Sequence, residues 1–254
     1  MVYPGYRIRR YGRQLGAIAM TGQLNLPLRL SDSASFDNFY PIGNEEVVEV
    51  VRSVTKRAND KPSLFIHGPP GSGKSHLLQA LSRLTVEEHG LNVYVPAGAS
   101  GVSPDLVSQL NANTVVCLDD LELIVGDREW EEGILELYER LNGGDGVLIV
   151  SAKQPPSLVG LDLADLATRF AAGGVYSLKP LAELDLPQAM RFRAGMRGLD
   201  LPDSVIQYLI RRLPRNSSVL FSLLDRIDKA AFSRQRRITV PFVKELEKEF
   251  FSEY

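Results

Sequence analysis

The middle of the chain alternates between short apolar runs and longer segments with helical periodicity. The apolar runs predict five strands, at residues 63–67, 91–95, 114–118, 146–150 and 175–178. The segments between them carry apolar residues at helical spacing, most clearly from Trp130 to Leu141. Strands that alternate with helices are typical of a parallel, doubly wound sheet. We therefore expect an α/β domain with a parallel five-stranded sheet over residues 36–180.

Beyond Pro180 the pattern becomes entirely helical. Four segments have helical periodicity, near residues 183–196, 203–213, 217–234 and 241–251. Pro202, Pro214 and Pro241 punctuate these segments, as proline does at the ends of helices. A small all-α domain over residues 181–254 is therefore predicted to follow the α/β domain.

A glycine-rich loop joins the first predicted strand to the next helix. It reads Gly68-Pro69-Pro70-Gly71-Ser72-Gly73-Lys74-Ser75 and fills every fixed position of a phosphate-binding loop. Glycine lets backbone N–H groups close around phosphates, and the helix N-terminus adds a favourable dipole. In such a loop Lys74 reaches the β- and γ-phosphates, and the Ser75 hydroxyl ligates Mg²⁺. The alternative is a Gly/Pro-rich turn, but the strand–loop–helix context favours binding of ATP or ADP with Mg²⁺.

The third and fourth predicted strands end in polar residues. Asp119 and Asp120 follow the third strand, and Ser151 follows the fourth. Because open α/β sheets bind ligands at the carboxyl ends of their strands, we expect these residues at a nucleotide site. Asp119 would hold the metal through Ser75 or water, and Asp120 would polarise the attacking water. Ser151 would orient that water or touch the γ-phosphate, although each residue also fits a simple exit from a strand.

Arg169 lies near the end of a predicted helix, just before the fifth strand. A cation there suits the negative end of the helix dipole. The same arginine also fits an arginine finger, which stabilises transition-state charge on a nucleotide held by a neighbouring subunit. Both interpretations stay open on these residues alone.

Composition excludes several classes of protein. The 254 residues carry a net charge of −2, so no global field draws the chain to DNA or to a membrane. The lone Cys117 excludes a disulfide scaffold and suits a reducing cytoplasm. No apolar run is long enough to span a bilayer. We therefore expect a cytoplasmic location.

The first thirty residues are basic and contain no acid. Their arginines stand at positions 7, 9, 10, 13 and 29. Three interpretations stay open: an Arg-rich targeting segment, a basic arm for nucleic acid, and sequence upstream of a translation start at Met20. We prefer the third, because a short tail begins at Met20, and we treat residues 1–35 as a flexible N-terminal tail.

The order of these features resembles the AAA+ ATPases. A phosphate-binding loop, an Asp-Asp pair, a polar strand end, an arginine before the last strand and a helical lid follow one another in that superfamily. Over residues 36–254 the layout is similar to the clade of DnaA-type replication initiators. The resemblance implies that residues 36–39 pack around the adenine. It places Asn38, Phe39 and His76 in the nucleotide site.

Two departures narrow this resemblance. Because the sequence ends at Tyr254, we expect neither the helix-turn-helix domain by which initiators read origin DNA nor the long N-terminal domain of an initiator. In their place residues 23–28 resemble the short peptide with which proteins dock on the bacterial sliding clamp. The expected contact residues of this motif are Gln23, Leu24, Leu26, Pro27 and Leu28. Leu26 and Leu28 would enter an apolar pocket while Gln23 hydrogen-bonds at its rim. The alternative is a tail that packs on its own domain.

Together these features resemble the Hda family, the DnaA-homologous regulatory inactivators, over roughly residues 20–254. The resemblance implies a negative regulator of chromosomal replication initiation. Such a protein sits on the sliding clamp of DNA polymerase III and supplies Arg169 to the nucleotide site of ATP-bound DnaA. The resemblance further implies bound ADP, little ATP turnover of its own and contact with DNA mainly through the clamp. It also implies a location at the nucleoid or replisome, and a monomeric ADP-bound state beside a homo-oligomeric one.

One position departs from this family. The resemblance implies an arginine at the start of the third lid helix, where it senses the nucleotide phosphates. An ungapped match places Ser218 there, with Arg215 three residues earlier, about one helical turn away. Either Arg215 substitutes from a displaced position, or the lid has lost its phosphate contact and discriminates less well between ATP and ADP.

Two other functions stay open. An autonomous ATPase of the helicase-loader or transposition-helper type would act on its own ATP through Lys74, Asp119 and Asp120, and would not need residues 23–28. A clamp-bound adaptor with a purely structural nucleotide would keep its function without Arg169. The tail motif favours the regulator and the adaptor over the autonomous ATPase.

Overall fold

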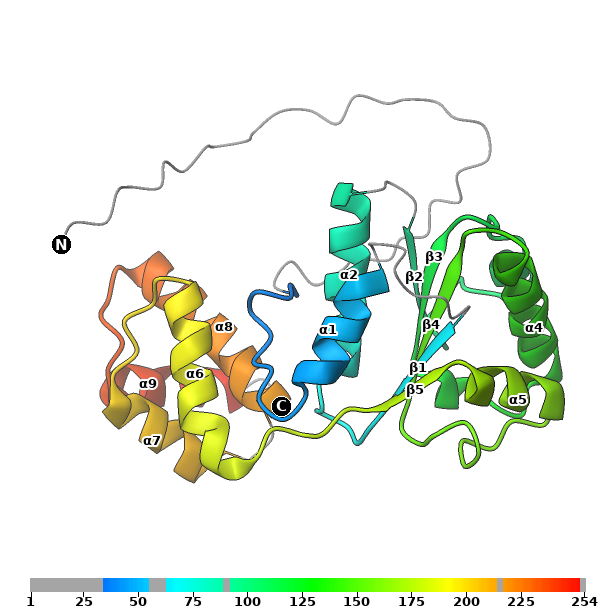
Figure 1. The fold of residues 1–254 in the computed structure, drawn as a ribbon. Helices are drawn as coiled ribbons and strands as arrows, with labels where there is room; N and C mark the ends of the chain where they lie inside the picture. The colour runs from blue at the N-terminus through cyan, green and yellow to red at the C-terminus, as the bar shows by residue number, and fades with distance from the viewer. Residues whose placement is uncertain (1–33, 55–62, 89–91, 214–216, 252–254) are drawn as a thin grey trace.

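The first part of the protein is an α/β unit. The computed structural model describes residues 34–54, 63–88, 92–213 and 217–251. The elements of the α/β unit are α1 (Glu45–Ser53), β1 (Ser63–His67), α2 (Lys74–Glu88), β2 (Asn92–Pro96), α3 (Pro104–Ser108), β3 (Val115–Asp119), the 3-10 turn η2 (Leu121–Leu123), α4 (Arg128–Asn142), β4 (Val147–Ala152), α5 (Ala164–Ala172) and β5 (Gly174–Ser177). The five strands form one parallel sheet in the order β2-β3-β4-β1-β5 (Figure 1).

Strand β1 lies inside this sheet, between β4 and β5, and is buried on both faces. Phe65 packs among residues of α4 and α5 on one face, while Leu64 and Ile66 pack among residues of α1 and α2 on the other. Successive side chains of a strand point to opposite faces, and a parallel sheet covered by helices buries both. This position fixes the loop that follows β1 at the carboxyl edge of the sheet.

A separate group of helices follows the sheet. It consists of the 3-10 turn η3 (Glu183–Asp185), α6 (Leu186–Met196), α7 (Asp203–Arg212), α8 (Ser217–Arg234) and α9 (Val240–Phe251). These helices bury a core of their own, to which Leu186, Ile206, Leu220 and Phe242 belong. None of the helices in the described ranges combines the length and hydropathy that a membrane crossing needs.

The predicted architecture is confirmed, and strand positions differ by about one residue. The third strand, for example, spans Val115–Asp119 rather than 114–118. The short helix α3 was not predicted, because five residues are too few to show a helical period. The predicted clamp motif at residues 23–28, the start at Met20 and Arg215 all lie outside the described residues.

Candidate functional site

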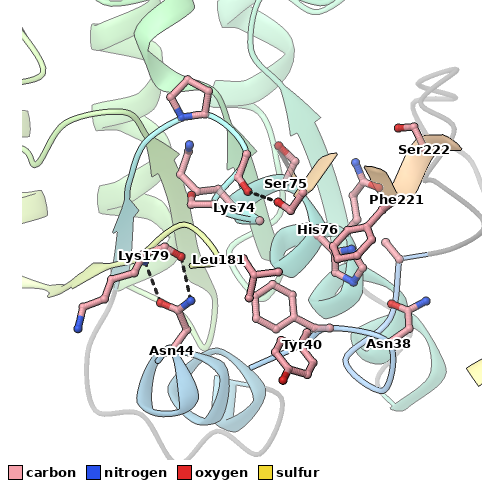
Figure 2. Close-up of a pocket in the computed structure, with 18 of the residues that line it drawn as sticks. Asn38, Tyr40, Asn44, Lys74, Ser75, His76, Lys179, Leu181, Phe221 and Ser222 are labelled. Atoms are coloured by element: carbon pink, nitrogen blue, oxygen red, sulfur yellow. Dashed lines mark hydrogen bonds between the residues drawn. The ribbon is translucent and has the colours of Figure 1, made fainter. Parts of the chain in front are cut away.

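A cavity of about 460 Å³ lies where the loop after β1 meets the lid. A cavity of this size suits a small-molecule ligand. Its walls come from the segment before α1, the glycine-rich loop with the first turn of α2, the acidic residues at the end of β3, and helices α6 and α8. Figure 2 shows the loop side with Lys74, Ser75 and His76, and α8 with Phe221 and Ser222. Its lining includes Asn38, Phe39, Gly71, Ser72, Gly73, Lys74, Ser75, His76, Asp120, Glu122, Lys153, Arg193, Ser217, Phe221 and Asp225. This cavity therefore brings together Pro70 to Ser75 of the predicted loop, the adenine-side residues Asn38, Phe39 and His76, and Asp120. Gly68 and Pro69, which were also predicted, lie outside its lining.

The glycine-rich loop has the backbone that only glycine adopts easily. Gly71 and Gly73 have φ angles of 80° and 100°. A Cβ on Gly73 would also lie 2.7 Å from Cε2 of Phe39, so the loop and the segment before α1 pack closely here. The glycines thus permit both the turn and the contact that closes the cavity.

The loop presents hydrogen-bond donors to the cavity. The Lys74 ammonium group is buried and donates to the carbonyl oxygens of Gly68 (2.8 Å) and Pro69 (3.4 Å). The first N–H groups of α2 have no partner within the helix. The hydroxyl oxygen of Ser72 is buried and has no hydrogen-bond partner among the described residues. A polyanion such as a nucleotide phosphate chain would satisfy all of these groups.

The adenine-side residues form a wall of low charge. The rings of Phe39 and His76 lie 5.5 Å apart between centroids, tilted by 58°. His76 Nε2 is 3.0 Å from the carbonyl oxygen of Ser35, so this nitrogen carries the proton and donates it. Burial lowers the pKa of His76 to about 4, which keeps the imidazole neutral near pH 7. Such a wall suits a base better than a phosphate.

The two adjacent acids have different environments. Asp119 is 1% exposed, and its carboxylate accepts hydrogen bonds from the hydroxyls of Tyr94 (2.6 Å) and Ser151. Gln79 donates in turn to the Tyr94 hydroxyl at 3.1 Å. Burial, with the Asp119 carboxylate second, raises the pKa of Tyr94, so this phenol stays a donor. Asp119 and Ser151 stand behind the cavity rather than in its lining, and their roles toward metal and γ-phosphate stay predictions.

Asp120 faces the cavity. Its backbone is left-handed (φ 58°, ψ 52°), and its N–H donates to the Ser151 hydroxyl oxygen at 3.0 Å. Glu122 and Lys153 lie beside it in the lining and form an ion pair of 3.3 Å. Burial, then Asp119 and Glu122, raise the pKa of Asp120, while Lys74 opposes them. A carboxylate with a raised pKa at this place is a suitable proton acceptor for water.

Arg169 is remote from the cavity lining. It lies on α5, on the sheet face opposite α1 and α2 (Figure 1). Its guanidinium pairs with Glu139 at 2.8 Å and Asp165 at 3.3 Å, and lies 5.8 Å from the centroid of the Tyr138 ring. The side chain is 38% exposed. The structure therefore separates Arg169 from the other predicted site residues and presents it at the surface.

Several residues of the site carry no sequence motif. Arg193, Ser217, Phe221 and Asp225 bring the lid into the cavity wall, and Ser217 donates to the carbonyl oxygen of Gly71 at 3.0 Å. They are distant from the loop in sequence, so only the packing of the lid against the loop reveals them. Tyr94 was missed for the same reason, because it lies on β2 and contacts Asp119 on the neighbouring strand β3.

The sheet order, the phosphate-type loop and the helical lid define an AAA+ protein. The family model of the bacterial DnaA ATPase domain matches residues 30–177, and that of the Hda lid domain matches residues 184–246. The first match covers more than half of the 254 residues. The chain belongs to the Hda/DnaA-like family of AAA+ proteins, in agreement with the resemblance seen in the sequence.

Solved structures of similar fold include two initiators and a motor. Domain III of the Thermotoga maritima replication initiation protein DnaA superposes with a TM-score of 0.72 at 19% identity, covering 88% of this chain and 99% of that one. AMPPCP-bound DnaA from Aquifex aeolicus gives 0.65 at 19% identity, covering 88% and 71%. The Thermotoga maritima RuvB branch migration motor gives 0.59 at 15% identity, covering 84% and 70%. At these identities the likeness shows the fold alone.

Proposed function

We propose that this protein is a negative regulator of chromosomal replication initiation that activates ATP hydrolysis by a DnaA initiator. Its membership of the Hda/DnaA-like family supports a role in replication. The observation that carries the proposal is the position of Arg169, which is partly exposed and remote from the chain's own cavity. An arginine so placed serves a nucleotide bound to another subunit.

The environment of Arg169 suits an arginine finger. Glu139 and Asp165 hold the guanidinium in place through charged contacts at the surface. A guanidinium binds phosphate oxygens with the same planar set of donors that it offers to carboxylates. When the initiator docks on α5, its γ-phosphate would replace these carboxylates as the acceptor. Arg169 would then stabilise the charge that develops during hydrolysis.

The chain's own cavity would hold ADP or ATP. Lys74 and the first N–H groups of α2 would bind the phosphates, and the wall of Phe39 and His76 would receive the base. Ser75 would ligate Mg²⁺ together with phosphate oxygens, and the bound ion would neutralise part of the phosphate charge. AMPPCP in the Aquifex aeolicus DnaA structure supports this assignment by analogy. With ADP bound, the protein would be monomeric and competent to meet the initiator.

The tail would tether the protein to DNA. Residues 23–28 would dock on the sliding clamp, and the DNA-loaded clamp would raise the local concentration of regulator near its partner. Contact with DNA would then be indirect, and the protein would be found at the replisome.

The test is the rate of ATP hydrolysis by the cognate initiator, measured with clamp loaded on DNA. We expect wild-type protein to accelerate hydrolysis, and Gln23→Ala to lose most of this effect because the rim hydrogen bond to the clamp is gone. Raising the concentration of Gln23→Ala should restore the rate, since only the tether is weakened. If wild-type protein leaves the rate of hydrolysis by the initiator unchanged, the proposal is wrong.

An autonomous ATPase is the second candidate, and the position of Asp120 in the cavity favours it. In that case the protein alone should turn over ATP, and Asp120→Ala should abolish this turnover by removing the proton acceptor. Turnover is measured as phosphate release without initiator or clamp. This function is excluded if the protein alone does not hydrolyse ATP, or if Asp120→Ala hydrolyses ATP as fast as wild type.

A further inference from the structure

Arg193 is a buried cation in the cavity wall. It lies on α6, is 7% exposed, and lines the same cavity as Lys74 and Ser75. Its guanidinium carbon lies 4.5 Å from the centroid of the Phe221 ring. Such a cation–π contact does not use all of the N–H groups of a guanidinium, so the others stay available as donors.

No acid among the described residues compensates Arg193 directly. It makes no hydrogen bond and no ion pair within the described part of the chain. Asp225, the acid nearby in the cavity wall, forms an ion pair with Arg197 instead, with 2.5 Å between Oδ1 and Nη2. Burial lowers the pKa of Arg193. The Asp225 carboxylate, which forms no ion pair with Arg193, opposes this shift only in part.

A buried guanidinium without hydrogen bonds lowers the stability of the fold. Its position next to the cavity therefore favours a bound ligand that accepts hydrogen bonds. Burying a charge destabilises a fold unless partners satisfy it. The cavity next to Arg193 is also lined by Lys74 and by the donors of the glycine-rich loop. An anionic ligand there would satisfy the cations of both walls at once.

We propose that Arg193 is the phosphate-binding residue of the lid. It donates hydrogen bonds to a phosphate oxygen of the nucleotide from α6 and supplies the positive charge that a serine at position 218 lacks. The Ser217 hydroxyl donates a hydrogen bond to the carbonyl oxygen of Gly71, so α8 contacts the glycine-rich loop. The positive charge comes from Arg193 on α6. This inference rests on the nucleotide binding proposed above. It also implies that Arg215 need not replace the missing arginine.

The test compares Arg193→Met with wild type. Methionine keeps the length and the packing on Phe221 but removes the charge and the donors. We expect ADP affinity, measured by calorimetry, to fall by about tenfold or more, since about 1.4 kcal/mol corresponds to tenfold. Without nucleotide, the Tm of the variant should equal or exceed that of wild type, because a buried charge without hydrogen bonds is gone.

Controls separate a phosphate contact from other roles. Arg191→Met removes a cation from the same helix, where Arg191 is half exposed and bonded to Asp203, and should leave ADP affinity unchanged. Arg215→Ala should also leave it unchanged. Affinity for adenosine should be alike in wild type and Arg193→Met, because adenosine has no phosphate.

Three results would overturn the inference. They are full ADP affinity in Arg193→Met, an equal loss for adenosine and ADP, and a lower Tm without nucleotide in this variant. A tenfold loss in Arg215→Ala would assign the role to that residue instead. If wild-type protein binds no ADP while it remains folded, the proposed nucleotide site fails first, which is a distinct outcome.

Discussion

Arg169→Ala is expected to return ATP hydrolysis by the initiator to its rate without the regulator. An arginine finger contributes about 10³-fold or more to hydrolysis, because it stabilises charge that exists only in the transition state. The variant keeps the tail and the cavity, so clamp binding and ADP affinity should be unchanged. Hydrolysis is measured in a single turnover of initiator-bound ATP, with clamp loaded on DNA.

Two further variants make this result specific. Arg128→Ala removes a surface arginine of α4 that pairs with Glu132, and it should stimulate like wild type. Arg169→Lys keeps the charge but loses the planar donor set, so it should recover only a small part of the activity. Full stimulation by Arg169→Ala, with normal clamp binding, would show that the protein is an adaptor whose arginine only supports α5.

The regular part of the fold was predictable because its signals are local. Strand β1 is a continuous apolar run, and the motif from Gly68 to Ser75 follows it directly. In the lid, α7 and α9 are amphipathic, and Pro202 and Pro241 lie at their starts. Local patterns also placed Asp120 correctly at the carboxyl edge of the sheet. These local patterns do not predict contacts between segments that are far apart in the sequence.

The environment of Asp119 shows this limit. Alternation along β3 turns Asp119 to the same face as Cys117, where Tyr94 of the neighbouring strand and Gln79 of α2 lie. The left-handed backbone of Asp120 then turns its own side chain to the cavity. The motif identifies two acids, but only strand pairing and one backbone angle decide which of them lines the cavity.

Arg193 shows the same limit in the lid. The resemblance to the Hda family implies a phosphate-sensing arginine at the start of α8, and an ungapped match places Ser218 there. Helices α6 and α8 pack side by side, so a residue of either helix is able to face the nucleotide. A motif that is searched along one helix does not find an arginine that lies on the neighbouring helix.

Glu131→Ala is expected to cost about 3 kcal/mol or more of the free energy of unfolding. Glu131 is 1% exposed, and its carboxylate accepts from the backbone N–H groups of Gly126 (2.9 Å), Asp162 (3.1 Å) and Leu163 (2.7 Å). Alanine leaves these three partly buried donors without their acceptor, and each costs about 1 kcal/mol, the low end for a donor left without a partner. Urea unfolding followed by circular dichroism measures the loss.

The neighbouring Glu132 provides the matched control. It is half exposed and pairs with Arg128 at the surface, so Glu132→Ala should cost about 0.5 kcal/mol or less. Equal losses in the two variants would contradict the role given to the Glu131 carboxylate. Leu163 is the residue before α5, so Glu131 also fixes the start of the helix that carries Arg169. Well below its Tm, folded Glu131→Ala should therefore stimulate the initiator less than wild type, although every atom of Arg169 is present.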